Sequence, residues 1–275
     1  MSAGFTQFVG IDYSGAQSPT SRLKGLQVCV AQPGTTPMQV VTPAAAAASA
    51  RGESHSAPRH WTRSEIALWI IDLIKRGEPA LIGIDHGFSF PETYFRRYSL
   101  DNWDAFLADF CRNWPTDRDH VYVDFVRERI DRDWLACTEL RVGKASELRL
   151  CERWTSSAKS VFQFDVQGQV AKSTHAGIPW LARIRDACGD TLHFWPFDGW
   201  TPPEGKSVIA EVYPSIFRNR YEREGRSPDE QDAYAVARWL ADTGTAGRLD
   251  RYFEPPMNDR ERQTAALEGW ILGIS

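Results

Sequence analysis

The segment FVGID at residues 8–12 decides the fold of this chain, together with the related segment ALIGID at residues 80–85. Each is an apolar run without alternation that ends in Gly-Ile-Asp, which is typical of a strand covered on both faces of a sheet. Residues 26–31 and 38–41 predict two further strands. They follow the first strand closely enough to pair with it as antiparallel hairpins.

A helix between the two Gly-Ile-Asp segments indicates the α/β class. The sequence TRSE at residues 62–65 is a capping box, in which the Thr and Glu side chains satisfy backbone N–H groups at a helix start. The apolar residues that follow lie on one helix face at positions 66, 69, 70, 73 and 74. A strand–helix–strand order predicts parallel pairing at the centre of the sheet.

The remaining segments complete an expected α/β fold. Strands are expected at residues 160–166 and 208–214, helices at about 179–187, 229–240 and 260–272, and a loop at residues 43–60. We expect a single domain over residues 1–275, with three antiparallel strands and then parallel strands in one mixed sheet. Helices flank the sheet, and a mostly helical insertion or cap is expected at about residues 92–158.

Composition and charge set limits on the function. The chain carries five Cys without a CxxC pair, which favours reduced thiols over a disulfide framework or a zinc knuckle. It has no apolar run long enough to span a membrane and no secretory signal at its start, so we expect a soluble, cytoplasmic protein. The net charge of −4 gives the surface as a whole no attraction for nucleic acid.

One stretch departs from this acidic balance. Residues 141–185 hold eight Lys or Arg against three acidic residues. Such a strip binds a phosphate-bearing substrate or is simply a solvated face, and the sequence leaves both readings open. Arg149 and Arg153 lie four positions apart, so they share one face if their segment is helical, and we expect them to contact substrate.

Carboxylates gather where strands end and where a helix begins. Asp12, Asp85 and Glu211 lie at or near the ends of buried strands, while Asp229 and Asp232 lie three apart in the first turns of the expected helix. A carboxylate at the end of an apolar strand is costly to bury unless it is paired or bound to metal. Ligands of parallel sheets bind beyond the carboxyl ends of the strands, where Asp12 and Asp85 would meet.

Neighbouring carboxylates raise one another's pKa, and a hard divalent cation relieves the conflict. Mg²⁺ and Mn²⁺ prefer such oxygen ligands, and one or two ions can promote hydrolysis of a phosphodiester. We therefore expect Asp12, Asp85, Asp232 and Asp229 to hold metal, with Glu211 as a further catalytic carboxylate. Helix capping is the alternative for Asp229, which follows Ser-Pro.

Other polar residues are weaker candidates for substrate contact. Ser14 follows the first strand, and Lys172, Thr174 and His175 form a polar cluster before a glycine. Each is placed to bind phosphate, and His175 is also suited to acid–base work near neutral pH. Turn formation or helix capping explains them equally well. The aromatic stretch at residues 194–200 predicts a core plug, with base stacking as the alternative.

The blocks FVGIDYSGA, LIGIDHGFSFP, VIAEVYPSIF and DEQDAYAVARW together resemble the domain of unknown function 429 family. The stretches AKSTHAGIPWL, HFWPFDGW and EGWILG are similar to further signatures of that family, so the resemblance extends from residue 8 to residue 273. The family is regarded as ribonuclease H-like and as predicted nucleases. That superfamily, which includes Holliday-junction resolvases and transposases, carries an Asp on the first strand, an acid on the fourth and one or two acids on a late helix.

The resemblance implies roles for individual residues. Asp12 matches the first-strand acid, Asp85 the fourth-strand acid, and Asp232, with or without Asp229, the helix acid. Glu211 matches the family's own Glu in its EV-x-P block. We therefore expect a metal-dependent phosphodiester hydrolase acting on nucleic acid or another phosphoester, with the oligomeric state left open.

Two other functions remain in competition with this one. Asp-Tyr-Ser-Gly at residues 12–15 also resembles the first phosphate loop of actin-like ATPases and sugar kinases, which share the fold. The sequence contains no good match to their glycine-rich adenosine motif. The other competitor is a binding protein without catalytic activity that has kept the fold.

Overall fold

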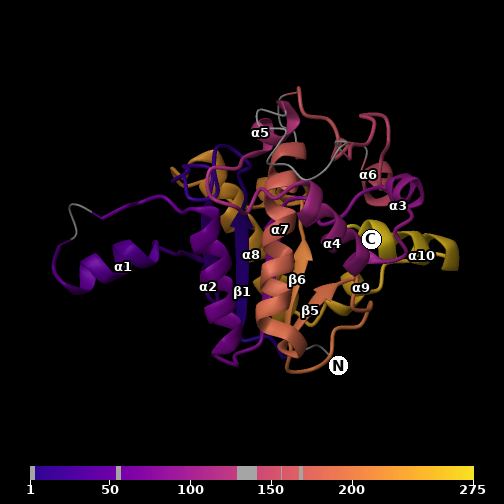
Figure 1. The fold of residues 1–275 in the computed structure, drawn as a ribbon. Helices are drawn as coiled ribbons and strands as arrows, with labels where there is room; N and C mark the ends of the chain where they lie inside the picture. The colour runs from indigo at the N-terminus through magenta and orange to yellow at the C-terminus, as the bar shows by residue number, and fades with distance from the viewer. Residues whose placement is uncertain (1–3, 54–56, 129–140, 156, 167–169) are drawn as a thin grey trace.

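A computed structural model provides the structure of the chain, which Figure 1 shows as a ribbon. The structure describes residues 4–53, 57–128, 141–155, 157–166 and 170–275.

One six-stranded mixed sheet forms the centre of the fold. Its strands are β1 (Gln7–Asp12), β2 (Gln27–Ala31), β3 (Met38–Gln39), β4 (Ala80–Asp85), β5 (Leu192–Trp195) and β6 (Ser207–Glu211). Their order across the sheet is β3-β2-β1-β4-β6-β5. The first three strands pair antiparallel, whereas β1, β4, β6 and β5 are parallel. The expected arrangement of antiparallel strands followed by parallel strands is confirmed.

Helices cover both faces of the sheet (Figure 1). They are α1 (Pro43–Ala50), α2 (Arg63–Lys75), α3 (Glu92–Tyr98), α4 (Trp103–Asn113), α5 (Val123–Glu128), α6 (Leu150–Trp154), α7 (Ala171–Cys188), α8 (Pro228–Thr245), α9 (Asp250–Phe253) and α10 (Asp259–Glu268). Short 3₁₀ turns lie at η1 (Gly189–Thr191), η2 (Pro214–Ile216) and η3 (Arg218–Arg220). In Figure 1, α2 and α7 lie side by side in front of the sheet and α8 lies behind it.

Side-chain alternation assigns each strand residue to one of these two layers. Val9 and Ile82 are register partners and belong to the large core cluster on the α2–α7 side. Phe8 and Leu81 are also partners, and they pack in the cluster that includes the apolar residues of α8. Counting on by twos, Asp12 falls on the α8 face of its strand, as does Asp85 (β4).

Helix α8 lies unusually close to β1 because glycine leaves room for it. A Cβ at Gly10 would lie 2.2 Å from the carbonyl oxygen of Ala233 and 2.8 Å from the Cβ of Val236. A Cβ at Gly83 would likewise lie 2.9 Å from a methyl of Val236. The Gly in each Gly-Ile-Asp segment therefore allows the helix that carries Asp229 and Asp232 to approach the sheet.

The α2 helix forms as its sequence predicts. Thr62 caps it by accepting a hydrogen bond from the backbone N–H of Glu65 at 3.1 Å, and the Glu65 carboxylate accepts one from the Thr62 N–H. Its apolar face, including Ile66, Ile70 and Ile74, is buried in the core against the sheet. Local capping and the burial of one face both support the same helix boundaries.

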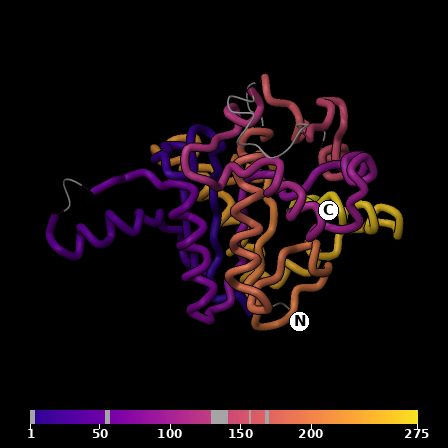
Figure 2. Tube along the Cα trace, in the orientation of Figure 1, coloured from indigo at the N-terminus to yellow at the C-terminus, as the bar shows by residue number. Residues whose placement is uncertain are grey.

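Several predicted elements differ from the structure. Residues 43–60 contain α1, which Thr42 caps and which begins with Pro43, so this segment is not entirely a loop. In Figure 2, α1 extends away from the rest of the molecule. Residues 160–166 form turns instead of a strand. The strand β5 was not expected, because the aromatic stretch that contains it has no period-two pattern. Phe194 and Trp195 of this strand are fully buried, as a core plug requires.

Pro179 lies inside α7, not near its start. A proline has no N–H to donate to the carbonyl four residues earlier, which is that of His175. The Thr116 hydroxyl donates a 2.6 Å hydrogen bond to this carbonyl instead. A contact from a distant segment therefore compensates for the proline, and the sequence around Pro179 gives no indication of it.

Of the predicted helical insertion at about residues 92–158, the structure describes residues 92–128, 141–155 and 157–158, which are only partly helical. Helices α3, α4, α5 and α6 fall within it, and turns join them over the described residues. Phe106 and Phe110 of α4 are fully buried, and α4 packs against α7. No helix in the described ranges combines the length and apolarity that a membrane span requires.

Candidate active site

Asp12 and Asp85 lie next to each other at the carboxyl edge of the sheet. They are direct register partners on the neighbouring parallel strands β1 and β4. Neighbouring strands are about 4.8 Å apart, and partners in a parallel pair point to the same face. The sequence prediction that these two acids meet is therefore consistent with the backbone pairing.

Helix α8 brings two further acids to the same place. It begins at Pro228 above the strand ends, where a Ser227–Glu230 capping box fixes its first turn. Asp229 and Asp232 lie in the first two turns and are each partly buried. Both act electrostatically on Asp12, and Asp232 also acts on Asp85. Four carboxylates from three elements thus converge on one region.

Burial and mutual repulsion raise the pKa values of these acids. For Asp12, burial raises the pKa most, followed by the charges of Asp85, Asp229 and Asp232. For Asp85, burial is again the main cause, followed by Asp232 and Glu211. Burial also raises the pKa values of Asp229 and Asp232. The cluster therefore disfavours its own full ionisation.

Arg218 is the cation that opposes this repulsion. Its Nη1 lies 3.1 Å from Oδ2 of Asp232, and its charge lowers the pKa of both Asp232 and Asp85. The Arg218 side chain remains 44% exposed, against 15% for Asp232. The ion pair is therefore half open to solvent, where such pairs contribute little to stability.

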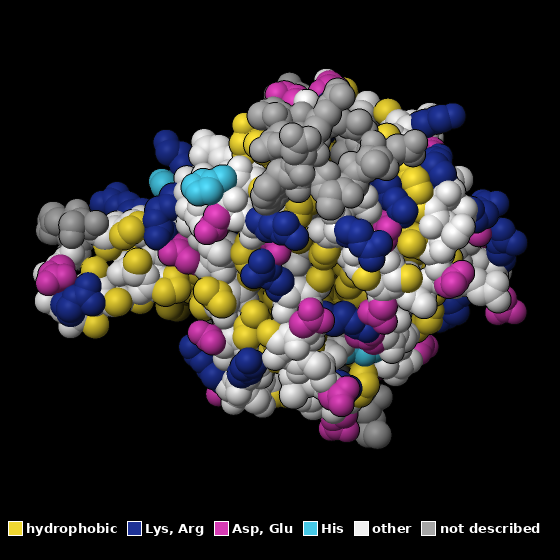
Figure 3. Space-filling model, in the orientation of Figure 1, with side chains coloured by type: hydrophobic (Ala, Val, Ile, Leu, Met, Phe, Trp, Pro, Cys, Tyr) yellow, Lys and Arg dark blue, Asp and Glu magenta, His cyan; other side chains and the backbone are white. Residues whose placement is uncertain are grey.

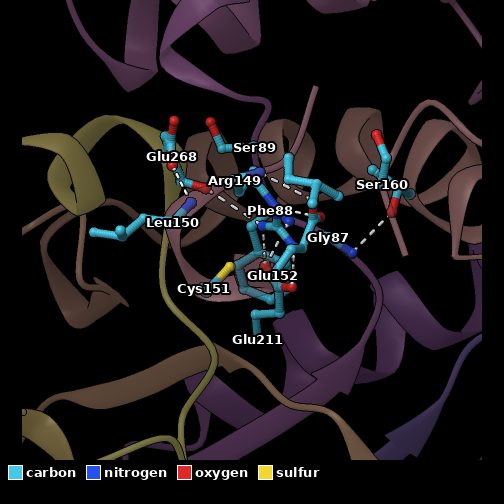
Figure 4. A network of polar contacts seen from close by, with 12 residues as sticks. Gly87, Phe88, Ser89, Arg149, Leu150, Cys151, Glu152, Ser160, Glu211 and Glu268 are labelled. Carbon is cyan, nitrogen blue, oxygen red and sulfur yellow. Dashed lines mark hydrogen bonds and ion pairs between the residues drawn. The ribbon is translucent and has the colours of Figure 1, made fainter. Parts of the chain in front are cut away.

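Glu211 belongs to a different environment. Its register partner is Ile84, which precedes Asp85, so alternation turns Glu211 to the opposite face of the sheet. There Arg149 forms a fork with both carboxylate oxygens at 2.6 and 2.7 Å, and the Phe88 N–H donates to Oε2 at 3.0 Å (Figure 4). The Arg149 and Glu211 side chains are 1% and 4% exposed.

This network reaches further through acids near Arg149, which Figure 4 shows from close by. Glu152 accepts a 2.8 Å bond from Nε of Arg149, and Glu268 accepts hydrogen bonds from the backbone N–H groups of Glu92 and Leu150. Arg149 is thus committed to carboxylates of the protein itself. The geometry gives both Arg149 and Glu211 a structural role in joining β6, α6 and α10.

The loop after β1 holds Ser14 beside the acids. A Cβ placed on Gly25 would lie 3.3 Å from the Ser14 Cβ and 3.8 Å from Oδ2 of Asp229, so these two side chains border one spot. The buried guanidinium of Arg63 fixes the loop by donating to the carbonyl oxygens of Ser14, Ala16 and Gln17. Ser14 is therefore brought to the cluster as expected.

The polar run at the start of α7 is placed otherwise. Thr174 and His175 are completely buried, and the Thr174 hydroxyl accepts a 2.9 Å hydrogen bond from the Gly87 N–H. His175 packs among aromatic rings, including those of Phe90 and Trp114, and burial lowers its pKa to about 3. Neither side chain faces the acids as a surface contact for substrate.

The Lys172 and Arg153 side chains are more exposed than those of Thr174 and His175. In the described residues neither forms a hydrogen bond or ion pair with Asp12, Asp85, Asp229 or Asp232. Lys172 forms a 2.7 Å ion pair with Asp124 of α5. Arg153 is exposed, and its Nη1 donates to the Leu148 carbonyl at 3.2 Å. Since Arg149 is buried and Arg153 exposed, these two do not form the shared substrate face that the sequence suggested.

Figure 3 shows no large patch of one charge on the face that it draws. There, Lys and Arg side chains are interspersed with Asp, Glu and apolar side chains. Within the basic stretch at residues 141–185, Arg141, Lys172, Arg183 and Arg185 each pair with an acid. Local charge balance is therefore a better description of these residues than a phosphate-binding surface.

Sequence reasoning missed Arg218 and Arg63. Arg63 lies within the capping-box sequence TRSE, which gives no local sign of its contacts with the loop after β1. Arg218 opens the segment RNRYEREGR, residues 218–226, which has four arginines directly before the acids of α8. That density of arginine beside predicted acids was a signal that could have identified it.

The donor chemistry of the cluster fits a hard divalent cation. Asp12, Asp85, Asp229 and Asp232 offer carboxylate oxygens, the ligands that Mg²⁺ and Mn²⁺ prefer. Their raised pKa values show that burial and mutual repulsion disfavour the ionised carboxylates, which a bound cation would stabilise. Over the residues that the structure describes, no three Asp, Glu, His or Cys side chains are already gathered into an ion cage. The acids are neighbours, but their side chains must adjust to share an ion.

Comparison with known proteins adds no relative. No family model matches the sequence, and no curated protein or solved structure is significantly similar to the chain.

Proposed function

We propose that this chain is a metal-dependent phosphodiester hydrolase of the ribonuclease H-like type, a nuclease. One observation carries the proposal: Asp12 and Asp85 are register partners on adjacent parallel strands, with the first turns of α8 facing them. The antiparallel-then-parallel strand order supports the ribonuclease H-like assignment. So does the resemblance of the sequence blocks to predicted nucleases.

In this proposal Asp12, Asp85 and Asp232 hold one or two Mg²⁺ or Mn²⁺ ions, with Asp229 as a further ligand. When bound, such an ion acts as a Lewis acid on the phosphodiester and makes water a better nucleophile. The rigid sheet fixes two of the carboxylates, so their positions depend little on side-chain freedom. Arg63 holds the loop of Ser14 beside them. Glu211 supports β6 from the other face and is not proposed as a ligand.

Of the four acids of the cluster, Asp85 lines a cleft beyond the ends of β4 and β6. Asp85, His86, Lys159, Glu211 and Tyr213 are among the residues that line it. Burial lowers the pKa of His86 to about 4, so this side chain is neutral at physiological pH. The cleft thus gives a substrate access to Asp85. Its lining is not uniformly anionic, because it includes the neutral His86 and Lys159.

Calorimetric titration with Mn²⁺ tests the metal site. The wild type is expected to bind Mn²⁺, whereas Asp12→Asn and Asp85→Asn each lose that binding while remaining folded by circular dichroism. Asp101→Asn, which removes an exposed acid from the loop between α3 and α4, is the matched control and retains wild-type binding. Unchanged Mn²⁺ affinity in both site variants would refute the metal assignment.

A cleavage assay tests the reaction. Single-stranded DNA, single-stranded RNA and a chromogenic phosphodiester are incubated with Mn²⁺ or Mg²⁺. Asp12→Asn is expected to reduce cleavage of the preferred substrate by about 10²-fold or more, because it removes a ligand of the ion that would balance the negative charge of the transition state. If Mg–ATP protects the protein against thermal unfolding while Mn²⁺ alone does not, the proposal fails in favour of an actin-like phosphotransferase.

A further inference from the structure

We propose that the pocket beside Asp232, lined by Arg218, Asn219 and Arg223, binds a phosphate group of the substrate. This inference rests on the proposed function, because it supplies the substrate contact that the metal site alone lacks. In this proposal Arg218 pairs with Asp232 in the free protein and with the phosphate of the substrate in the complex.

The pocket adjoins the acid cluster directly. Asp232, Gln231 and Pro228 of α8 form one side, and residues from the preceding loop form the other. The same Asp232 acts on both Asp12 and Asp85. A phosphate group in the pocket is therefore next to the carboxylates proposed to hold metal, as a phosphate that flanks a cleaved bond must be.

The loop that carries the two arginines is held in place. Gln231 donates hydrogen bonds to the carbonyl oxygens of Arg218 and Tyr221 at 3.2 and 2.9 Å. Its own carbonyl accepts a 2.9 Å bond from Nε of Arg226, whose guanidinium lies 3.6 Å from the centre of the Tyr234 ring. Since these contacts fix the loop backbone to α8, the pocket is preorganised, while the Arg218 side chain remains 44% exposed.

The four arginines in residues 218–226 differ in their contacts and in whether they line the pocket. Arg226 is occupied by the contacts that hold the loop. Arg220 is exposed and does not line the pocket. Arg218 and Arg223 line it, and among the described residues Asp232 is the one carboxylate that pairs with Arg218. Two of the four cations thus line the same pocket, and Nε of Arg223 also donates to the Arg226 carbonyl oxygen.

The Arg218–Asp232 pair is suited to exchange, in contrast to Arg149–Glu211. Arg149 is buried and forms a two-bond fork with Glu211 at 2.6 and 2.7 Å. Arg218 approaches Asp232 through a single nitrogen, at 3.1 and 3.5 Å, and is 44% exposed. A cation that binds Asp232 would displace Arg218. Once the cation neutralises the carboxylates, the planar guanidinium of Arg218 binds a phosphate more strongly than it binds those carboxylates.

A phosphate can approach the acid cluster only if a nearby cation offsets the repulsion from the carboxylates. Four neighbouring carboxylates repel a phosphate, and among the cations described Arg218 is the one that lowers the pKa values of both Asp85 and Asp232. The basic residues at 141–185 that the sequence suggested for this purpose are instead largely paired with acids of the protein. The arginines beside α8 take over that role.

The test measures inorganic phosphate binding to the full chain by nuclear magnetic resonance, without metal and at low ionic strength. The Arg218 and Arg223 side-chain signals are expected to shift on titration. Arg218→Ala should weaken phosphate binding by about tenfold, which corresponds to one charge-assisted hydrogen bond. Arg220→Ala removes the same charge from the same loop outside the pocket and should change the affinity much less.

A second variant separates a specific pocket from general attraction. Asp232→Asn removes the carboxylate that competes for Arg218, so phosphate should bind more tightly while Mn²⁺ binds more weakly. Equal weakening in Arg218→Ala and Arg220→Ala would overturn the pocket, as would unchanged phosphate affinity in Asp232→Asn. Competition of thymidine monophosphate and of a short oligothymidylate with phosphate then distinguishes a nucleotide from a polymer as the source of the group.

The two proposals can fail separately. If Mn²⁺ does not bind but phosphate binding still depends on Arg218, the pocket stands and the hydrolase proposal fails. If Mn²⁺ binds at Asp12 and Asp85 but phosphate binding ignores Arg218, the hydrolase proposal stands and the pocket is refuted.

Discussion

The pKa values of Asp12 and Asp85 depend on the residues that surround them. Burial and the charges of nearby acids raise the pKa values of both side chains. In the metal-free protein this arrangement is unfavourable once the acids ionise. A raised folded-state pKa means that the folded chain holds these protons more tightly than the unfolded chain does.

This pKa shift predicts a pH dependence of stability. The contribution of Asp12 and Asp85 to the free energy of unfolding is fully present below the ordinary aspartate pKa of about 3.9. It is lost as the pH rises through the raised pKa values of the folded state. Without metal, Asp12→Asn should flatten this loss and stabilise the protein at neutral pH by about 0.5–2 kcal/mol. Urea unfolding of the two proteins between acid and neutral pH measures the effect.

Saturating Mn²⁺ should reverse the order, because the wild type then gains stability by binding and the variant does not. Asp101→Asn again serves as the control and should follow the wild-type profile. A variant profile parallel to that of the wild type at every pH would contradict the assigned repulsion.

At the scale of elements, the contact between α8 and the sheet positions half of the site. The helix reaches β1 across Gly10, where a Cβ would lie 2.2 Å from the Ala233 carbonyl oxygen. A backbone atom cannot yield as the tip of a flexible side chain can. The distance from Asp229 and Asp232 to the strand acids therefore depends on a residue that has no side chain.

Gly10→Ala should consequently displace α8 and weaken both stability and metal binding. Overpacking at such a contact costs about 1–3 kcal/mol in the free energy of unfolding. Gly4→Ala is the matched control, since a Cβ there meets nothing within 4 Å. Thermal unfolding and Mn²⁺ titration of both variants measure the effect. Full Mn²⁺ affinity in a destabilised Gly10→Ala protein would show that α8 does not set the site geometry.

Element-level prediction from sequence succeeded where local signals agreed. The capping box at residues 62–65 predicted the start of α2, and the apolar runs of β1 and β4 predicted buried strands, without information from distant residues. It failed where a distant contact decides the outcome. The α7 helix continues through Pro179 because Thr116 satisfies the carbonyl that the proline leaves free. Glu211 lies on the other face of the sheet from Asp85 because its register partner is Ile84.

At the scale of the whole molecule, a buried ionic network joins segments that are far apart in the chain. Arg149 pairs with Glu211 of β6 and with Glu152 of α6, while Glu268 of α10 accepts from the backbone of Leu150 and Glu92. The sequence alone suggested that Arg149 contacts substrate and that Glu211 is catalytic. Neither residue reveals its partner locally, because 62 positions separate them.

Breaking this network should unfold the protein more readily without removing the metal site. Arg149→Met leaves Glu211 and Glu152 buried without a cation, which costs about 3–5 kcal/mol. The double variant Arg149→Met with Glu211→Gln should recover part of that loss. Urea unfolding measures both, and Mn²⁺ titration of whichever variant is folded should give near wild-type affinity. Loss of Mn²⁺ binding from a folded Glu211→Gln protein would instead make Glu211 a ligand.

The most direct test of the central claim is a crystal structure of the chain grown with Mn²⁺, with the ion located by its anomalous scattering. The hydrolase account predicts a peak between the carboxylates of Asp12 and Asp85, within bonding distance of Asp232, and Arg218 turned away from Asp232. A map without a peak there, in which Arg218 still pairs with Asp232 at full Mn²⁺ concentration, would contradict it.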